Sequence, residues 1–216
     1  MLQGFFNYEN PVWRFIGRLA DIMLLNLLWV VCSLPVFTLG ASTTALYYCT
    51  LKIVRDEDDG NVRMFFRSFR LNFRQATLIW LAMLLAGSIL SIDFYFFGRI
   101  MEGSDMLRFV LRAVTLAILL LWLLLFLYVW PVLARFDNSI RRTVTNAIYM
   151  SITHLGSTLA MLVTDAVLVL AAYFSLFYLP ILVPVLLLLG FPAIAWVNST
   201  MFEHIFRRYM PEEEQP

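Results

Sequence analysis

Long apolar runs dominate the pattern of hydrophobic and polar positions along this chain. Residues 22–39, 76–97 and 113–133 each form one run, and residues 159–201 form a fourth. Runs of about 18 or more apolar residues are long enough to cross a bilayer as helices, and the fourth run is roughly twice that length. Pro180 divides it, because proline removes a backbone donor and favours a helix start. The pattern therefore predicts five membrane-spanning helices, the last two joined as a hairpin.

The stretch 40–55 poses a separate question, because it is richer in hydroxyl side chains than an ordinary span. As a helix it would be about 24 Å long, against a hydrocarbon core of about 30 Å. If it crosses, every Lys and Arg except Arg99, Arg108 and Arg112 falls on one side of the membrane. Basic residues in short loops stay cytoplasmic. We therefore predict that this stretch crosses as a short helix packed against protein.

The fold class that follows is an all-α integral membrane protein, a compact bundle of about six transmembrane helices. Both termini are expected in the cytoplasm, and residues 1–216 form a single membrane domain. The expected spans are about 20–39, 40–55, 76–98, 109–134, 157–179 and 181–205. Two amphipathic segments, about 61–75 and 138–155, are expected on the cytoplasmic side.

The segment 61–75 combines arginines with aromatic residues at helical spacing. An arginine recurs every three or four positions, and an apolar stripe that starts at Val62 runs one position ahead of it. The candidate residues are Arg63, Phe66, Arg67, Phe69, Arg70, Phe73 and Arg74. A basic amphipathic helix of this kind lies at the membrane interface, with arginines toward anionic headgroups and phenylalanines toward acyl chains. We expect such an interfacial helix here; the alternative is a docking surface for a partner protein.

Polar groups within the predicted spans form a candidate intramembrane site. They are Asp165, Asn26, Asn198 and Asp93. An ionisable group inside a span is costly, so it faces protein or water. Asp165 lies roughly 9 Å from the cytoplasmic start of its span. Its partner is expected on another span, and Asn26 and Asn198 are both at plausible depths. A hydrogen bond that fixes helix packing is one interpretation; a solute path or a proton-linked switch is the other. Asp93 lies near the outer surface, where an arginine is available to pair with it.

Composition and motifs exclude several function classes. The chain is 61% hydrophobic and 14% charged, and its net charge of +1 gives no bulk attraction for nucleic acid. It contains no nucleophile–base set, no phosphate-binding loop and no metal-ligand spacing around its two cysteines. The acidic turn 56–60 does not match a calcium-binding EF-hand loop. We therefore expect a protein that is not an enzyme and binds no cofactor or metal.

The block GASTTALYYCTLKIVRDEDDGNVRMFFRSFRLNFRQATLIWL, residues 40–81, resembles the YesL family of small bacterial membrane proteins. The segments FFNYENPVWRFIGRLAD and TVTNAIYMSITHLGST are similar as well. The resemblance implies no catalytic residues. It implies a place in the cytoplasmic membrane of Gram-positive bacteria. The family's genes tend to lie beside carbohydrate importers of the ATP-binding-cassette (ABC) type and polysaccharide-degrading enzymes, which implies a link to carbohydrate import.

On this basis we expect a non-enzymatic accessory component of oligosaccharide import by an ABC-type transporter. Its expected partners are anionic membrane lipids, at the arginine stripe, and permease subunits of the importer. One alternative is a small-solute channel or carrier, whose mark would be a continuous polar path through the bundle. A membrane-bound regulator or assembly factor is the other.

Overall fold

The computed structural model describes residues 11–57, 60–99 and 104–210. Within these residues every regular element is helical, as the sequence predicts. The long helices are α1 (Pro11–Ser33), α2 (Leu39–Val54), α3 (Asn61–Arg99), α4 (Asp105–Arg135), α5 (Ile140–Thr153), α6 (Leu155–Tyr178) and α7 (Val183–Phe206). Three short 3-10 turns lie between or after them, namely η1 (Val36–Thr38), η2 (Pro180–Leu182) and η3 (Arg207–Tyr209).

Three of the described helices, α3, α4 and α6, are long and apolar enough to cross a membrane. Much of their apolar surface has no protein neighbour: Leu85 of α3, Phe109 of α4 and Val163 of α6 are each more than 60% exposed. Water would penalise so large an apolar surface, whereas lipid accepts it. The chain is therefore a helical membrane protein.

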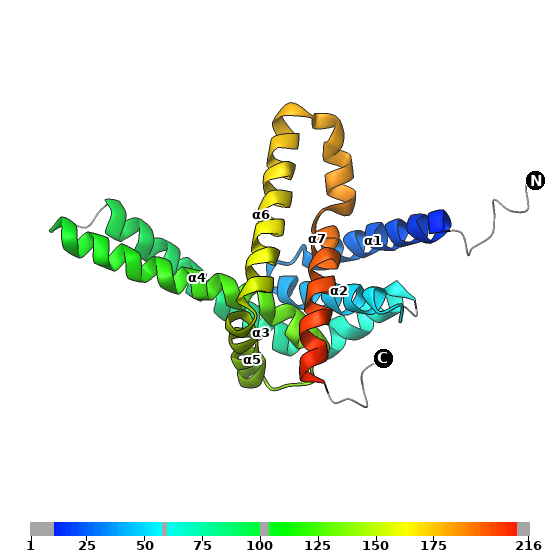
Figure 1. Cartoon of the computed structure of the whole chain (residues 1–216), viewed down its shortest axis with the longest axis horizontal. Helices are drawn as coiled ribbons and strands as arrows, with labels where there is room; N and C mark the ends of the chain where they lie inside the picture. Colours follow the sequence, from blue (N-terminus) through cyan, green and yellow to red (C-terminus); the bar gives the residue numbers. More distant parts are fainter. Residues whose placement is uncertain (1–10, 58–59, 100–103, 211–216) are drawn as a thin grey trace, which may run out of the picture.

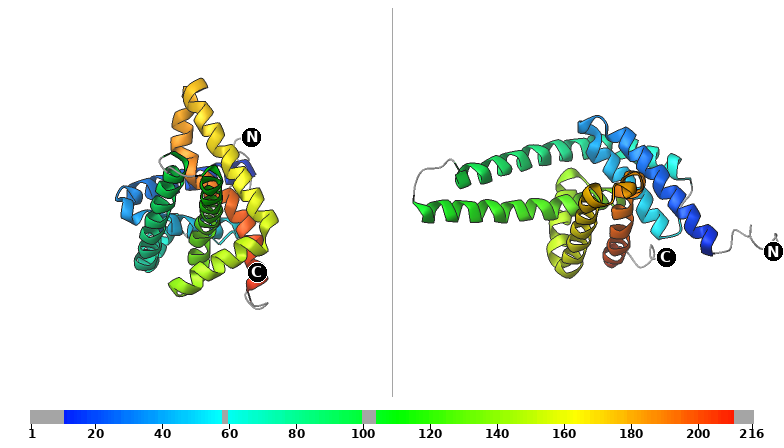
Figure 2. Two further views of the ribbon diagram at one scale, coloured as in Figure 1. Left: turned by 90° about the vertical axis from the view of Figure 1, so that its left-hand side faces the viewer. Right: turned by 90° about the horizontal axis from the view of Figure 1, so that it is seen from above.

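The helices form two hairpins on a common base instead of the single compact bundle that the sequence predicts (Figure 1). The α3–α4 hairpin extends to one side of the base, and the α6–α7 hairpin rises from it in a different direction (Figures 1 and 2). Apolar surfaces gain little by packing together in lipid, so the outer halves of the hairpins have no strong drive to associate. The contacts that determine the arrangement lie in the base, where α2 packs against α1, α3, α4 and α7.

Prolines determine where two pairs of helices separate. The first predicted span continued to residue 39, but α1 ends at Ser33, because Pro35 cannot continue a helical hydrogen-bond ladder. The Thr38 hydroxyl then donates to the carbonyls of Cys32 and Pro35, at 2.5 and 2.6 Å, and fixes the turn into α2. At the other end of the chain, Pro180 lies in η2 and joins α6 to α7 in the hairpin that the sequence predicts.

The composition of α2 is explained by its central position. Every residue from 40 to 47 is buried. Gly40 allows the closest approach, because a Cβ there would lie 2.6 Å from the Ala76 carbonyl oxygen and 2.9 Å from the Trp130 ring. The hydroxyls of Ser42 and Thr44 donate to carbonyls one turn earlier in the helix, so they are buried without a polar penalty. The predicted short, protein-packed helix is present; its crossing of the bilayer stays a prediction.

Helix α3 is continuous over 39 residues, about 58 Å. The segment 61–75 is therefore the first part of α3 and not a separate helix, which corrects the predicted boundary; its position at the membrane interface stays a prediction. The physical reason for the continuous helix is that no proline or glycine occurs between Asn61 and Gly87, so nothing interrupts the backbone ladder where the arginines give way to apolar residues.

Candidate functional site

Asp165 and Asn198 meet across the α6–α7 hairpin. Nδ2 of Asn198 lies 3.0 Å from Oδ1 and 3.1 Å from Oδ2 of Asp165, and it donates to both oxygens. Asn198 is fully buried and Asp165 is half-buried. Of the two partners that the sequence left open, the structure thus places Asn198 against Asp165. A half-buried carboxylate that accepts an amide donor from the next helix fixes the two helices relative to each other.

Helix α2 adds polar groups to the same region. The buried Tyr47 side chain interacts with Asn198. One turn further along α2, the hydroxyls of Thr50 and Ser199 are 2.7 Å apart and both residues are fully buried. These contacts connect the central helix to α7 through buried polar groups, although the amide oxygen of Asn198 has no hydrogen-bond partner among the described residues.

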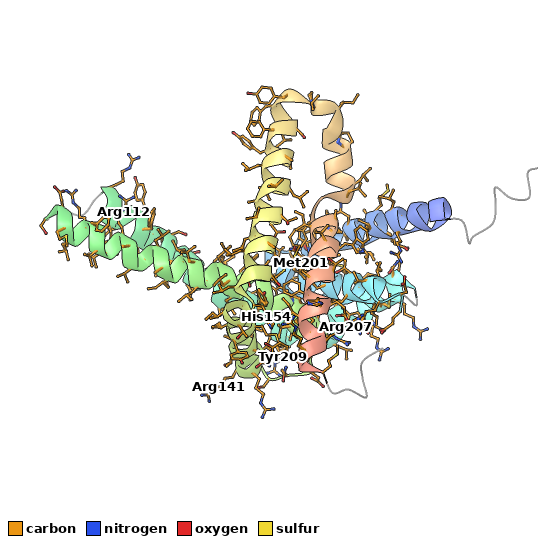
Figure 3. All side chains as sticks on the ribbon, viewed as in Figure 1. Arg112, Arg141, His154, Met201, Arg207 and Tyr209 are labelled. Atoms are coloured by element: carbon orange, nitrogen blue, oxygen red, sulfur yellow. The ribbon has the colours of Figure 1, made fainter. Side chains whose placement is uncertain are left out.

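The other two predicted members of the intramembrane site lie on other helices. Asn26 is buried on α1. Asp93 is half-buried on α3, toward the tip of the α3–α4 hairpin. The expected arginine partner of Asp93 is not found among the described residues. Arg108 pairs with Asp105, and the Arg112 guanidinium lies 4.9 Å from the centre of the Phe94 ring (Figure 3).

The predicted docking stripe borders a cavity between α2 and the first part of α3. Arg63, Phe66, Arg67 and Arg70 line this cavity of about 620 Å³. From the opposite side, Tyr48 and Lys52 of α2 complete the wall, and the Lys52 ammonium lies 5.7 Å from the centre of the Tyr48 ring.

Two of the stripe's phenylalanines also contact protein. Phe69 and Phe73 are partly buried and pack against the buried core, so their contact with acyl chains stays a prediction. They pack there because α2 covers this side of α3, which the spacing of aromatic residues alone does not reveal. Arg74 is exposed and lies outside the cavity.

A buried ion-pair network at the end of α2 was not found by sequence reasoning. Arg55 Nε lies 3.7 Å from Glu203 Oε2, and both side chains are about 95% buried. Glu57 contacts Arg55 at 3.4 Å from the solvent side, and Arg207 contacts Glu203 at 3.4 Å. Buried charges require partners, so this network fixes the ends of α2 and α7 together. The sequence signal that could have revealed this network is Glu203, the lone glutamate at the end of the last apolar run. It is predicted to lie at the same membrane surface as Arg55.

A further polar contact joins the start of α6 to the end of the described chain. His154 Nε2 lies 3.0 Å from the Tyr209 hydroxyl (Figure 3). Burial lowers the pKa of His154 below its ordinary value, and the charges of Arg208 and His204 act in the same direction. The neutral imidazole is therefore favoured. Within the described residues no group of three or more His, Cys, Asp and Glu could hold a metal ion.

Comparison with known proteins gives a family without an assigned activity. A family model described as "Protein of unknown function, DUF624" matches residues 22–94, which include α2 and the basic part of α3. The uncharacterized protein YteU of Bacillus subtilis (strain 168) is 30% identical over 172 residues, covering 79% of this chain and 74% of YteU. The uncharacterized protein YesL of the same organism is 28% identical over 162 residues, covering 74% of this chain and 75% of YesL. No solved structure matches. The chain therefore belongs to the DUF624 family, which includes YteU and YesL.

Proposed function

We propose that this protein is a non-enzymatic, multi-pass component of the bacterial cytoplasmic membrane that acts as an accessory subunit in carbohydrate import. The observation that carries the proposal is the apolar surface of two hairpins that diverge from one base. Each hairpin offers a separate apolar surface, at the depth of the lipid tails, to other membrane helices. The YesL resemblance supports the choice of an ABC-type oligosaccharide importer, whose permease subunits are the proposed partners.

The proposed topology has six spans with both termini in the cytoplasm. The charge distribution supports it, because the basic residues of α3 and the loops at the base then share the cytoplasmic side. The pairs Asp165–Asn198 and Arg55–Glu203 support a scaffold role, because each of them joins α7 to another helix.

Photocrosslinking in cells tests the proposed partner. An alkyl diazirine amino acid placed at Leu85 or Val163, which are 64% and 62% exposed, should crosslink to a permease subunit of a carbohydrate importer. The matched control is the same probe at Met161, which lies on α6 two residues from Val163 and is fully buried. Mass spectrometry of the adducts identifies the partner. Adducts with lipid alone, or equal protein adducts at Met161, would contradict the proposal.

The second candidate is a small-solute channel or carrier, and the Asp165–Asn198–Tyr47 contacts inside the helices are the observation that favours it. Purified protein in liposomes should then transport a small sugar, and Asp165→Asn should abolish the flux. A membrane-bound regulator or assembly factor predicts neither flux nor a stoichiometric complex with a permease.

A further inference from the structure

We propose that the cavity between α2 and α3 binds a phosphate group. The Tyr48 site, as we name it, consists of Tyr48 and Lys52 on α2 and Arg63, Arg67 and Arg70 on α3. The proposal does not depend on the role in carbohydrate import. It also differs from an interfacial stripe, because it requires a two-walled site with residues from both helices.

The charge of the Tyr48 site is of one sign. Four cations line the cavity of about 620 Å³, and its described lining contains no carboxylate. Two smaller cavities, of about 320 and 150 Å³, share Tyr48 with it and reach Arg135, and each of them also contains one carboxylate, Asp137 and Glu57 respectively. A concave surface with several cations concentrates anions more strongly than a flat one.

The three arginines of the site lack counter-ions in the described part of the chain. None of Arg63, Arg67 and Arg70 forms an ion pair there, whereas Lys52 Nζ lies 3.7 Å from Glu57. On a helix, like charges three or four positions apart repel each other. A bound anion removes this repulsion and gains charge-assisted hydrogen bonds from guanidinium groups, whose fork matches phosphate oxygens.

Ion pairs next to the cavity show which basic residues are available to bind the anion and which ones only support the structure. Arg55 is buried and its charge is met by Glu203 and Glu57, so it holds the end of α2 in place and is not a ligand contact. The cavity also has apolar lining from Phe66 and Leu71, and both are exposed at its edge. The site therefore accepts a phosphate on an apolar carrier, such as an anionic phospholipid, as well as a free phosphate compound.

Binding measurements on the purified full-length chain in a neutral detergent test the site. The probes are short-chain phosphatidylglycerol, phosphatidylcholine of equal chain length, and inorganic phosphate against chloride at matched ionic strength. Native mass spectrometry and the thermal midpoint report binding. We expect phosphatidylglycerol, inorganic phosphate or both to bind and raise the midpoint. Phosphatidylcholine should not, because its choline cancels the phosphate charge and is repelled by the arginines.

Variants on both walls decide whether the cavity is responsible. Arg67→Gln and Lys52→Gln should each weaken anion binding by about tenfold, the effect of losing one charge-assisted hydrogen bond. Arg74→Gln is the matched control, because Arg74 is exposed on the same helix outside the cavity. It should leave affinity within about twofold. Binding of phosphatidylglycerol without inorganic phosphate identifies a lipid headgroup, and competition by inorganic phosphate identifies a soluble source. Equal weakening by Arg67→Gln and Arg74→Gln, or no preference over phosphatidylcholine, overturns the proposal.

Discussion

Asp165 is held by a neutral amide and not by a counter-ion. The amide nitrogen of Asn198 donates to both carboxylate oxygens. The contact therefore requires a donor on one helix and an acceptor on the other, and it does not require two opposite charges. Polar contacts between helices in lipid contribute about 0.6 kcal/mol on average and up to about 1.7 kcal/mol. The pair is therefore a moderate contribution to stability that also fixes how α6 and α7 face each other.

Exchanging the two side chains tests this interpretation. Asp165→Asn leaves only one accepting oxygen opposite the Asn198 amide, so it should lower the free energy of unfolding by about 0.6–1.7 kcal/mol. The double exchange Asp165→Asn with Asn198→Asp restores one amide and one carboxylate, and should recover most of that loss. The measurement is unfolding in mixed micelles with increasing SDS. If the exchange stays as unstable as the single variant, the position of the charge matters and a functional role for Asp165 gains support.

The sequence located Asp165 as a site of interest but could not choose its partner. A lone aspartate in an apolar run must face a polar partner or water, and this requirement follows from the sequence alone. The choice between Asn26 and Asn198 depends on which helices are neighbours. The hairpin at Pro180 contained the missing signal, because positions 165 and 198 lie at roughly equal distances on either side of it and so reach similar depth.

At the scale of elements, small side chains on α2 determine how closely the base packs. The sequence indicated that this short helix packs against protein, because hydroxyl and small residues suit helix contacts in lipid. It did not indicate that the arginine segment continues into the next span. Hydrophobicity changes abruptly near residue 76, yet helix formation depends on the backbone, and a change from polar to apolar side chains does not end a helix.

Gly40 provides the element-scale prediction. An alanine Cβ there would press on the backbone of α3 at Ala76 and on the side chains of Trp80 and Trp130. Gly40→Ala should therefore destabilise the protein by about 1–3 kcal/mol, because a packed helix interface must move apart. The matched control is Gly156→Ala on α6, where a Cβ meets nothing within 4 Å and the change should be neutral or stabilising by up to about 1 kcal/mol. Thermal midpoints in detergent measure both, and equal midpoints would show that α2 and α3 are not packed as described.

At the scale of the whole molecule, the sequence predicted the helical membrane character of the chain better than the way its helices are arranged. Apolar runs show which segments avoid water, but lipid satisfies them as well as another helix does, so the pattern does not determine which runs are neighbours. Hydropathy alone therefore does not predict that the α3–α4 and α6–α7 hairpins diverge (Figure 1). The two-walled Tyr48 site was hidden for a related reason, because Lys52 and Arg67 come together only when α2 folds onto α3.

The position of α3 in the membrane gives the last prediction. This helix is about 58 Å long and a hydrocarbon core is about 30 Å thick, so its two ends lie on opposite sides if it spans. From the arginines of its first part we expect that end to lie in the cytoplasm. In a background without Cys32 and Cys49, a membrane-impermeant thiol reagent should label Met106→Cys in intact cells, and Val62→Cys only after permeabilisation. Val62 and Met106 are 43% and 71% exposed, so both positions are accessible once the reagent reaches them. Labelling of Val62→Cys from outside intact cells would contradict the six-span topology.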